Sequence, residues 1–134
     1  MCIRDRCVGA ERGIVFIRHE YGAERARLET ALEAARAAGV LGRDLFGAGF
    51  SFDVEIFVSP GGYILGEETA LLECMEDRRG EPRNKPPFPG NAGLDGLPTL
   101  INNVETLVHA VSIIHRGVDS VSYTHLTLPT ICSV

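Results

Sequence analysis

The sequence has 134 residues, of which 45% are hydrophobic and 23% are charged; these values suit one globular domain and argue against disorder. The formal net charge is −5, and because an acidic chain gains nothing from counterion release on a phosphate backbone, we expect no nucleic acid partner. No apolar run approaches the roughly 18 residues needed to cross a bilayer, so we expect no direct membrane insertion.

A strand, a helix and a second strand follow one another in the first half of the chain. The β-rich apolar runs at residues 14–17 and 54–58 predict two buried strands. Between them, apolar residues recur at helical spacing and predict an amphipathic helix over residues 23–38, with Gly39 as its C-terminal cap. This order predicts an α/β fold in which the two strands pair in parallel through a right-handed crossover.

The second half of the chain is predicted as two helices joined by a long loop. A tight turn at residues 59–62 leads into a helix that begins near Gly66 and ends at residues 78–80. Residues 80–98 hold five prolines and four glycines, which exclude regular structure, but their apolar residues predict a packed loop. Asn102 or Asn103 is expected to cap a last helix that ends near residue 116, with an apolar stripe formed by Val104, Leu107, Val108 and Val111.

The two ends do not continue this pattern. Residues 122–130 resemble translated sequencing-adapter DNA, and residues 1–6 look like the matching artefact at the other end. We therefore expect residues 1–6 and 118–134 to be artefact tails and the true polypeptide to continue beyond both junctions. The alternative is a genuine short protein with unusual termini.

Three groups of residues offer binding chemistry, and each has a simpler structural explanation. The glycines at 61, 62 and 66 lead into a helix whose N-terminal N–H groups could meet an anion, whereas Glu67 and Glu68 could merely complement the helix dipole, worth about 0.3–1 kcal/mol each. A basic and aromatic loop could hold a phosphate and stack on a base, or be a surface loop with its phenylalanine in the core; its residues are Arg78, Arg79, Arg83, Lys85 and Phe88. Of Asn102 and Asn103, one suffices as a helix cap and the other is left for a ligand or for solvent.

Other kinds of site are not indicated. The four histidines lack metal-ligand spacing, and no P-loop or GxSxG motif occurs. The four cysteines form no CxxC pair and their spread favours a reducing compartment, with Cys74 expected to be a buried apolar residue inside a helix. We assign no metal ligand and no catalytic acid or base.

Taken in order, three segments resemble the FMN- and NADH-binding flavoprotein subunit of respiratory complex I (NADH-quinone oxidoreductase). They read GGYILGEETALLE (residues 61–73), RRGEPRNKPPFP (78–89) and GLDGLPTLINNVETL (93–107). The resemblance covers about residues 14–117 and implies that residues 7–117 are a partial, Rossmann-like FMN/NADH-binding domain. The family's first glycine-rich FMN loop would lie upstream and its iron–sulfur cysteines downstream, so we expect this fragment alone to be inactive and to bind FMN weakly or not at all. Without the missing strands its sheet would have an exposed edge, so we also expect poor solubility.

The resemblance also implies roles for particular residues. FMN would be bound by Tyr63, Gly66, Glu67, Glu68, Asn102 and Asn103. The NADH cleft would include Glu68, Lys85 and Phe88, with Phe88 placed to stack on the adenine. In that family NADH passes a hydride to FMN, and electrons then leave to iron–sulfur clusters, so the cofactors carry the reaction and the protein positions them.

The wider setting is likewise implied by the resemblance. The cofactors would be FMN, NADH and, in the full-length subunit, a 4Fe–4S cluster whose ligands lie outside this sequence. The partners would be other peripheral-arm subunits of complex I, especially the 2Fe–2S thioredoxin-like subunit, on the cytoplasmic face of the cell membrane. The alternatives are the diaphorase subunit of an NAD-linked formate dehydrogenase or hydrogenase, and a non-catalytic fragment.

Overall fold

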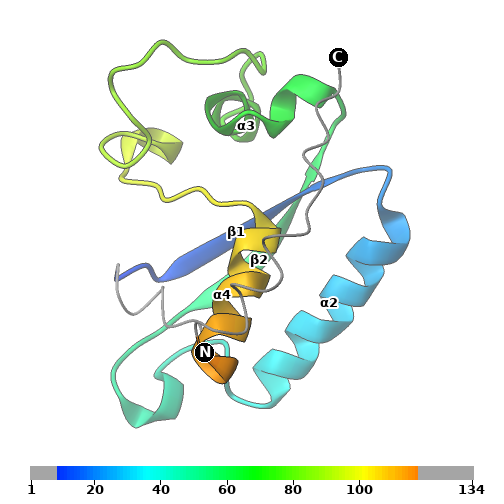
Figure 1. The fold of residues 1–134 in the computed structure, drawn as a ribbon, viewed down its shortest axis with the longest axis vertical. Coiled ribbons are helices and arrows are strands. Elements are labelled where there is room, and N and C mark those ends of the chain that lie inside the picture. Colours follow the sequence, from blue (N-terminus) through cyan, green and yellow to red (C-terminus); the bar gives the residue numbers. More distant parts are fainter. Residues whose placement is uncertain (1–8, 118–134) are drawn as a thin grey trace.

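The computed structural model describes residues 9–117, and Figure 1 traces their path. Both predicted tails lie outside the described residues. The regular elements, in chain order, are strand β1 (Arg12–Arg18), helix α2 (Gly22–Ala37), strand β2 (Asp53–Ser59), helix α3 (Glu68–Met75) and helix α4 (Val104–Arg116). Short 3₁₀ turns occupy Leu45–Gly47, Tyr63–Gly66 and Leu94–Gly96.

The two strands pair in parallel, as predicted. Their register runs from Arg12 opposite Asp53 to Arg18 opposite Ser59, with α2 as the crossover. The α/β fold class is therefore confirmed. Within residues 9–117 the sheet has only these two strands, so each strand has one edge without a backbone partner.

The core lies between α3 and one face of the strand pair. The rings of Phe16 and Phe57 are stacked with their centroids 5.4 Å apart, and they pack against a buried cluster of Leu65, Ala70 and Cys74. Because successive side chains of a strand alternate between faces, the residues beside Phe57 point the other way, toward α2. Figure 1 shows α3 and α2 on opposite sides of the strands.

Helix α2 is held to the other face of β2 by its last turn. The Arg36 guanidinium donates to the Val54 carbonyl at 2.6 Å and to the Asp53 carboxylate at 2.9 Å. Gly39 adopts φ = +69° just beyond the helix, which confirms the predicted glycine cap. None of the α2 side chains is fully buried.

Helix α3 is shorter than predicted. It ends at Met75 rather than at residues 78–80, because Asp77 adopts a left-handed conformation (φ = +56°). The Arg78 amide then donates back to the Glu73 carbonyl at 2.9 Å, which is the bond of a Schellman C-cap without its usual glycine. The chain therefore reverses over α3 earlier than the glycine at residue 80 suggested.

The proline- and glycine-rich loop is held by backbone hydrogen bonds, but two of the apolar residues from which its packing was predicted, Phe88 and Leu97 (65% exposed), are not buried. Pro89 and Gly93 are buried, and the Thr99 amide donates to the Pro89 carbonyl at 2.8 Å. Phe88, in contrast, is 56% exposed. The alternative in which this phenylalanine anchors the loop in the core is therefore wrong.

Helix α4 begins where predicted but does not bury its apolar stripe. Asn103 is the N-cap, and its side-chain oxygen accepts from the Glu105 amide at 3.0 Å. Val104, Val108 and Val111 are each about 60% exposed (58%, 60% and 63%). Leu107, the fourth residue of the predicted stripe, is half-buried, so three of its four residues face solvent.

Candidate functional site

The structure brings three of the predicted site residues together at the start of α3. The Lys85 ammonium donates to the Glu68 carboxylate, and its Nζ lies 3.7 Å from a Glu67 oxygen. The hydrogen bond to Glu68, followed by the charges of Glu68 and Glu67, raises the pKa of Lys85 despite some desolvation. Two segments that are 17 residues apart in sequence therefore meet as one charged cluster.

Glu67 is the N-cap of α3. One of its carboxylate oxygens accepts from the Thr69 and Ala70 amides, at 2.8 Å each, and from the Thr69 hydroxyl at 2.5 Å. Partial burial alone would raise the pKa of Glu67, but these hydrogen bonds and the Lys85 charge outweigh it, and the pKa is lowered. Those amides are consequently occupied, so the prediction that the helix N-terminus offers them to an anion is wrong, and the structural explanation holds for Glu67.

Glu68 differs from its neighbour. Its side chain is 42% exposed, and Lys85 is its side chain's only polar partner within residues 9–117. No capping hydrogen bond constrains it. Of the two glutamates, Glu68 is therefore the one whose carboxylate is available to a ligand.

The turn before α3 leaves its backbone open on one side. Gly61 and Gly62 have φ values of +123° and +102°, a region that favours glycine. The Tyr63 side chain is 92% exposed. A Cβ atom built on Gly66 would meet nothing within 4 Å, so a flat ligand could approach the backbone there.

The two asparagines are not joined to this cluster by any polar contact within the described part of the chain. Asn103 is used as the cap of α4. The Asn102 side chain is exposed and has no hydrogen bond to any residue in 9–117. This arrangement matches the prediction that one asparagine caps the helix and the other remains for a ligand or for solvent.

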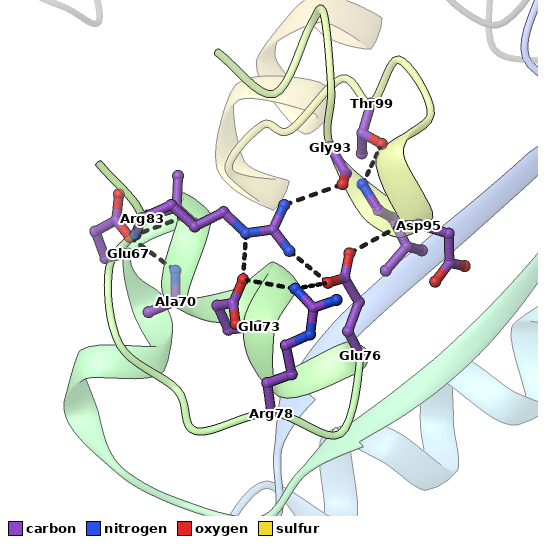
Figure 2. Close-up of polar contacts among 11 residues, drawn as sticks. Glu67, Ala70, Glu73, Glu76, Arg78, Arg83, Gly93, Asp95 and Thr99 are labelled. Carbon is purple, nitrogen blue, oxygen red and sulfur yellow. Dashed lines mark hydrogen bonds and ion pairs between the residues drawn. The ribbon is translucent and has the colours of Figure 1, made fainter. Parts of the chain in front are cut away.

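The arginines of the loop do not form one phosphate-binding cluster with Lys85. Arg83 and Arg78 are both paired with Glu73 of α3 and with Glu76, the C-cap of that helix, as Figure 2 shows. Arg79, 87% exposed, pairs with Glu81. Sequence reasoning missed the arginine–glutamate network, although Glu73 and Glu76 are three residues apart and therefore share one face of the helix.

Other kinds of site are not found in the described part of the chain. No group of three or more His, Cys, Asp or Glu side chains there could hold a metal ion. Cys74 is buried, as predicted, and burial raises the pKa of its thiol. None of the helices between residues 9 and 117 is both long enough and apolar enough to span a bilayer.

Comparison with known proteins points in one direction. A family model described as the Nuo51 FMN-binding domain matches residues 1–112. The NADP-reducing hydrogenase subunit HndC of Solidesulfovibrio fructosivorans is 47% identical over 119 residues, covering 89% of this chain and 24% of that protein. A subunit of the NADH-quinone oxidoreductase of Mycobacterium tuberculosis is 48% identical over 112 residues, covering 84% of this chain and 25% of that protein.

A solved structure agrees with these relatives. A chain of the NAD⁺-reducing [NiFe]-hydrogenase in its H2-reduced state superposes with a TM-score of 0.74 at 37% identity, covering 87% of this chain and 19% of that one. The chain thus spans about a quarter of the length of the curated relatives it matches.

Proposed function

The chain belongs to the Nuo51 FMN-binding domain family, and on that premise we propose that it is part of a longer NADH dehydrogenase subunit that binds NADH and FMN and transfers a hydride between them. The family and the fold are those of flavoprotein oxidoreductase subunits. The residue roles and the hydride transfer are our proposal, and three features of this chain support it.

The turn before α3 fits one wall of a flavin site. Tyr63 is almost fully exposed beside it, and the open side of Gly66 allows a planar ring to lie against the backbone. Elsewhere in the chain, the exposed Asn102 carries an amide that can both donate and accept, as the polar edge of a flavin requires. Glu67 contributes by fixing this turn on α3, since its carboxylate is engaged as the helix cap.

The observation that carries the proposal is the contact between Lys85 and Glu68. This contact joins a cation and a carboxylate at the start of α3, and Phe88, three residues further along the loop, has an exposed ring. A lysine can meet a pyrophosphate, a carboxylate can accept from ribose hydroxyls, and an aromatic ring can stack on adenine. Together these groups have the chemistry needed to bind a dinucleotide.

When bound, FMN would accept the hydride of NADH and pass electrons to iron–sulfur clusters. The residues of this chain would bind and orient the two cofactors and exclude water from the space between them. No described side chain needs to move a proton in this scheme. Ligands for the 4Fe–4S cluster, and the remaining FMN contacts, would lie in other parts of the subunit.

The substitution Gly66→Ala tests this proposal in the complete subunit, meaning the longer protein that contains this sequence. Because the new methyl group meets nothing within 4 Å, the fold should keep its stability. The FMN content after purification, read from flavin absorbance, should fall, and the Kd for FMN should rise by about tenfold, or 1.4 kcal/mol.

Gly90→Ala is the matched control, since Gly90 also has open space around it and lies away from the turn. Both variants should melt like the wild-type subunit. Unchanged FMN affinity in Gly66→Ala would show that the flavin does not lie against the backbone at Gly66. A wild-type subunit that binds no FMN at all would refute the proposed function.

The relatives also support a second candidate for the enzyme complex to which this subunit belongs, with the same NADH and FMN chemistry. The hydrogenase subunit and the quinone oxidoreductase subunit match this chain at nearly equal identity, 47% and 48%. The subunit could therefore serve as the diaphorase of an NAD-linked hydrogenase or formate dehydrogenase. Purification of the native complex distinguishes the two candidates. A complex I subunit would co-purify with peripheral-arm subunits, including a 2Fe–2S thioredoxin-like one, from the cytoplasmic face of the membrane. A diaphorase subunit would co-purify with hydrogenase or dehydrogenase subunits.

A further inference from the structure

We propose that Arg83 is a positioning residue: by fastening both ends of the loop between residues 83 and 95 to α3, it sets where Lys85 and Phe88 stand relative to Glu68. This inference rests on the proposed function, because Lys85, Phe88 and Glu68 are the residues assigned there to NADH. Arg83 itself touches neither cofactor in this scheme. It acts through the loop that it holds.

All three nitrogens of the Arg83 guanidinium donate a hydrogen bond within the protein. Nε donates to Glu73, Nη2 donates to Glu76 at 2.6 Å, and Nη1 donates to the Gly93 carbonyl at 3.0 Å. Figure 2 shows the guanidinium at the centre of this network, with α3 on one side and the loop on the other. The side chain is only 23% exposed, so these bonds are partly shielded from water.

The two ends of the loop are both fastened to the Glu76 carboxylate. Arg83 binds Glu73 and Glu76 at the first end. At the second end, the Asp95 amide donates to Glu76 at 2.8 Å, beside the Gly93 carbonyl that Arg83 holds. Lys85 and Phe88 lie between these two anchor points, so their positions are restricted from both directions.

A second link ties the loop directly to the cluster at the start of α3. The backbone amide of Arg83 donates to the Thr69 hydroxyl at 2.8 Å, and that hydroxyl donates to Glu67 at 2.5 Å. Thr69, at the middle of this chain of bonds, is 1% exposed, and both bonds are partly buried. Thr69 is the residue after Glu68 in α3, and Arg83 is two residues before Lys85 in the loop. A shift of Arg83 would therefore move the Lys85–Glu68 contact.

An arginine is needed here rather than any cation. The Glu73 and Glu76 side chains are only 16% and 7% exposed, so two carboxylates are held close together with little solvent. A planar guanidinium can donate to both carboxylates and to a carbonyl at once, whereas a lysine ammonium is a single point with a different reach. Arg78 assists at 3.2 Å from Glu76, but its side chain is 64% exposed.

The test uses the complete, FMN-loaded subunit and measures binding of ADP-ribose, the part of the dinucleotide without nicotinamide, by titration calorimetry. Arg83→Lys and Arg83→Met should weaken ADP-ribose binding by about tenfold, because Lys85 and Phe88 would no longer be preorganised for the ligand. Flavin content should stay at the wild-type level, and the KM for NADH should rise with kcat little changed. Arg79→Met is the matched control, since Arg79 is an exposed arginine of the same segment and its side chain pairs only with Glu81 within residues 9–117.

A purely stabilising role would give a different result, namely a smaller folded fraction in which each remaining molecule binds ADP-ribose with wild-type affinity. That result overturns the inference. If Arg83→Met does not fold, the triple variant Arg83→Met, Glu73→Gln, Glu76→Gln removes the unpaired charges, and wild-type affinity in that variant also overturns it. A wild-type subunit that binds neither FMN nor ADP-ribose overturns both this inference and the proposed function, whereas intact wild-type binding with unaffected Arg83 variants overturns this inference alone.

Discussion

A Cβ atom placed on Gly93 would lie 2.3 Å from the Cβ of Thr99 and 2.9 Å from the Pro89 carbonyl oxygen. The Thr99 amide already donates to that same carbonyl, and its hydroxyl accepts from the Leu94 amide at 2.9 Å. Two segments of the loop therefore touch at Gly93, where a side chain has no room. The absence of a side chain at Gly93 is therefore a packing requirement.

Gly93→Ala should therefore destabilise the loop. Because one partner in the overlap is backbone, relaxation is limited, and we expect a loss of about 1–3 kcal/mol in the free energy of unfolding, typical of overpacking. Urea unfolding of the complete subunit measures it. Gly90→Ala, with open space around the new methyl group, should be close to neutral, and equal stability of the two variants would contradict this account.

The adjacent glutamates Glu67 and Glu68 should have separable effects. Glu67→Ala removes the cap of α3 and should cost about 0.5–2 kcal/mol of stability. Glu68→Ala removes only a half-exposed ion pair, worth less than about 1 kcal/mol, but should raise the KM for NADH. Thermal melts and NADH titrations of both variants check this division; a stable Glu67→Ala or an unaffected KM in Glu68→Ala would count against it.

Local sequence patterns predicted most of the fold because the elements concerned are decided locally. The alternation of apolar runs and the spacing in α2 were enough to predict a parallel pair and its crossover. The end of α3 was not predictable in this way, because Asp77 takes a left-handed conformation that is usually expected of glycine. Three-dimensional packing decided that position.

In the candidate site, too, some features could be predicted from local sequence and others depend on tertiary packing. The glycine turn and the loop lysine could be recognised from motifs, whereas the partners of Arg83 could not. Residues 73 and 83 are ten positions apart on different elements, and only the reversal of the chain after α3 brings them together. The arginines that are close in sequence therefore have different roles in the structure. Arg83 binds Glu73 and Glu76, Arg78 assists it, and Arg79 forms an exposed pair with Glu81.

Acid should weaken the attachment of the loop through Glu76. Partial burial alone would raise the pKa of Glu76, but the hydrogen bonds from Arg83 and the Asp95 amide, with the nearby charges of Arg83 and Arg78, outweigh it and lower the pKa. A group with a lowered folded-state pKa stabilises the fold above its ordinary value, about 4.3 for glutamate, and that contribution disappears as the pH falls through the folded-state value.

We therefore expect the urea midpoint of the complete subunit to fall as the pH drops from about 6 to below 4, with a shallower fall in Glu76→Gln. Glu29→Gln is the control, because Glu29 forms an exposed pair with Arg25 on α2, and such pairs contribute about 0–1 kcal/mol. Identical pH profiles for wild type and Glu76→Gln would show that this carboxylate is not the acid-sensitive group.

The exposed stripe of α4 should promote self-association of the isolated 134-residue chain. Val104, Val108 and Val111 present a continuous apolar face, and both strands of the sheet have an open edge within residues 9–117. Contiguous apolar surface and open strand edges both promote self-association. We expect this chain to form large assemblies, and the double variant Val108→Lys, Val111→Glu to shift it toward monomer in light-scattering measurements. Thr106→Lys adds a charge on another side of the same helix and should have little effect; a monodisperse wild-type chain with a cooperative melt would show that the stripe is already covered.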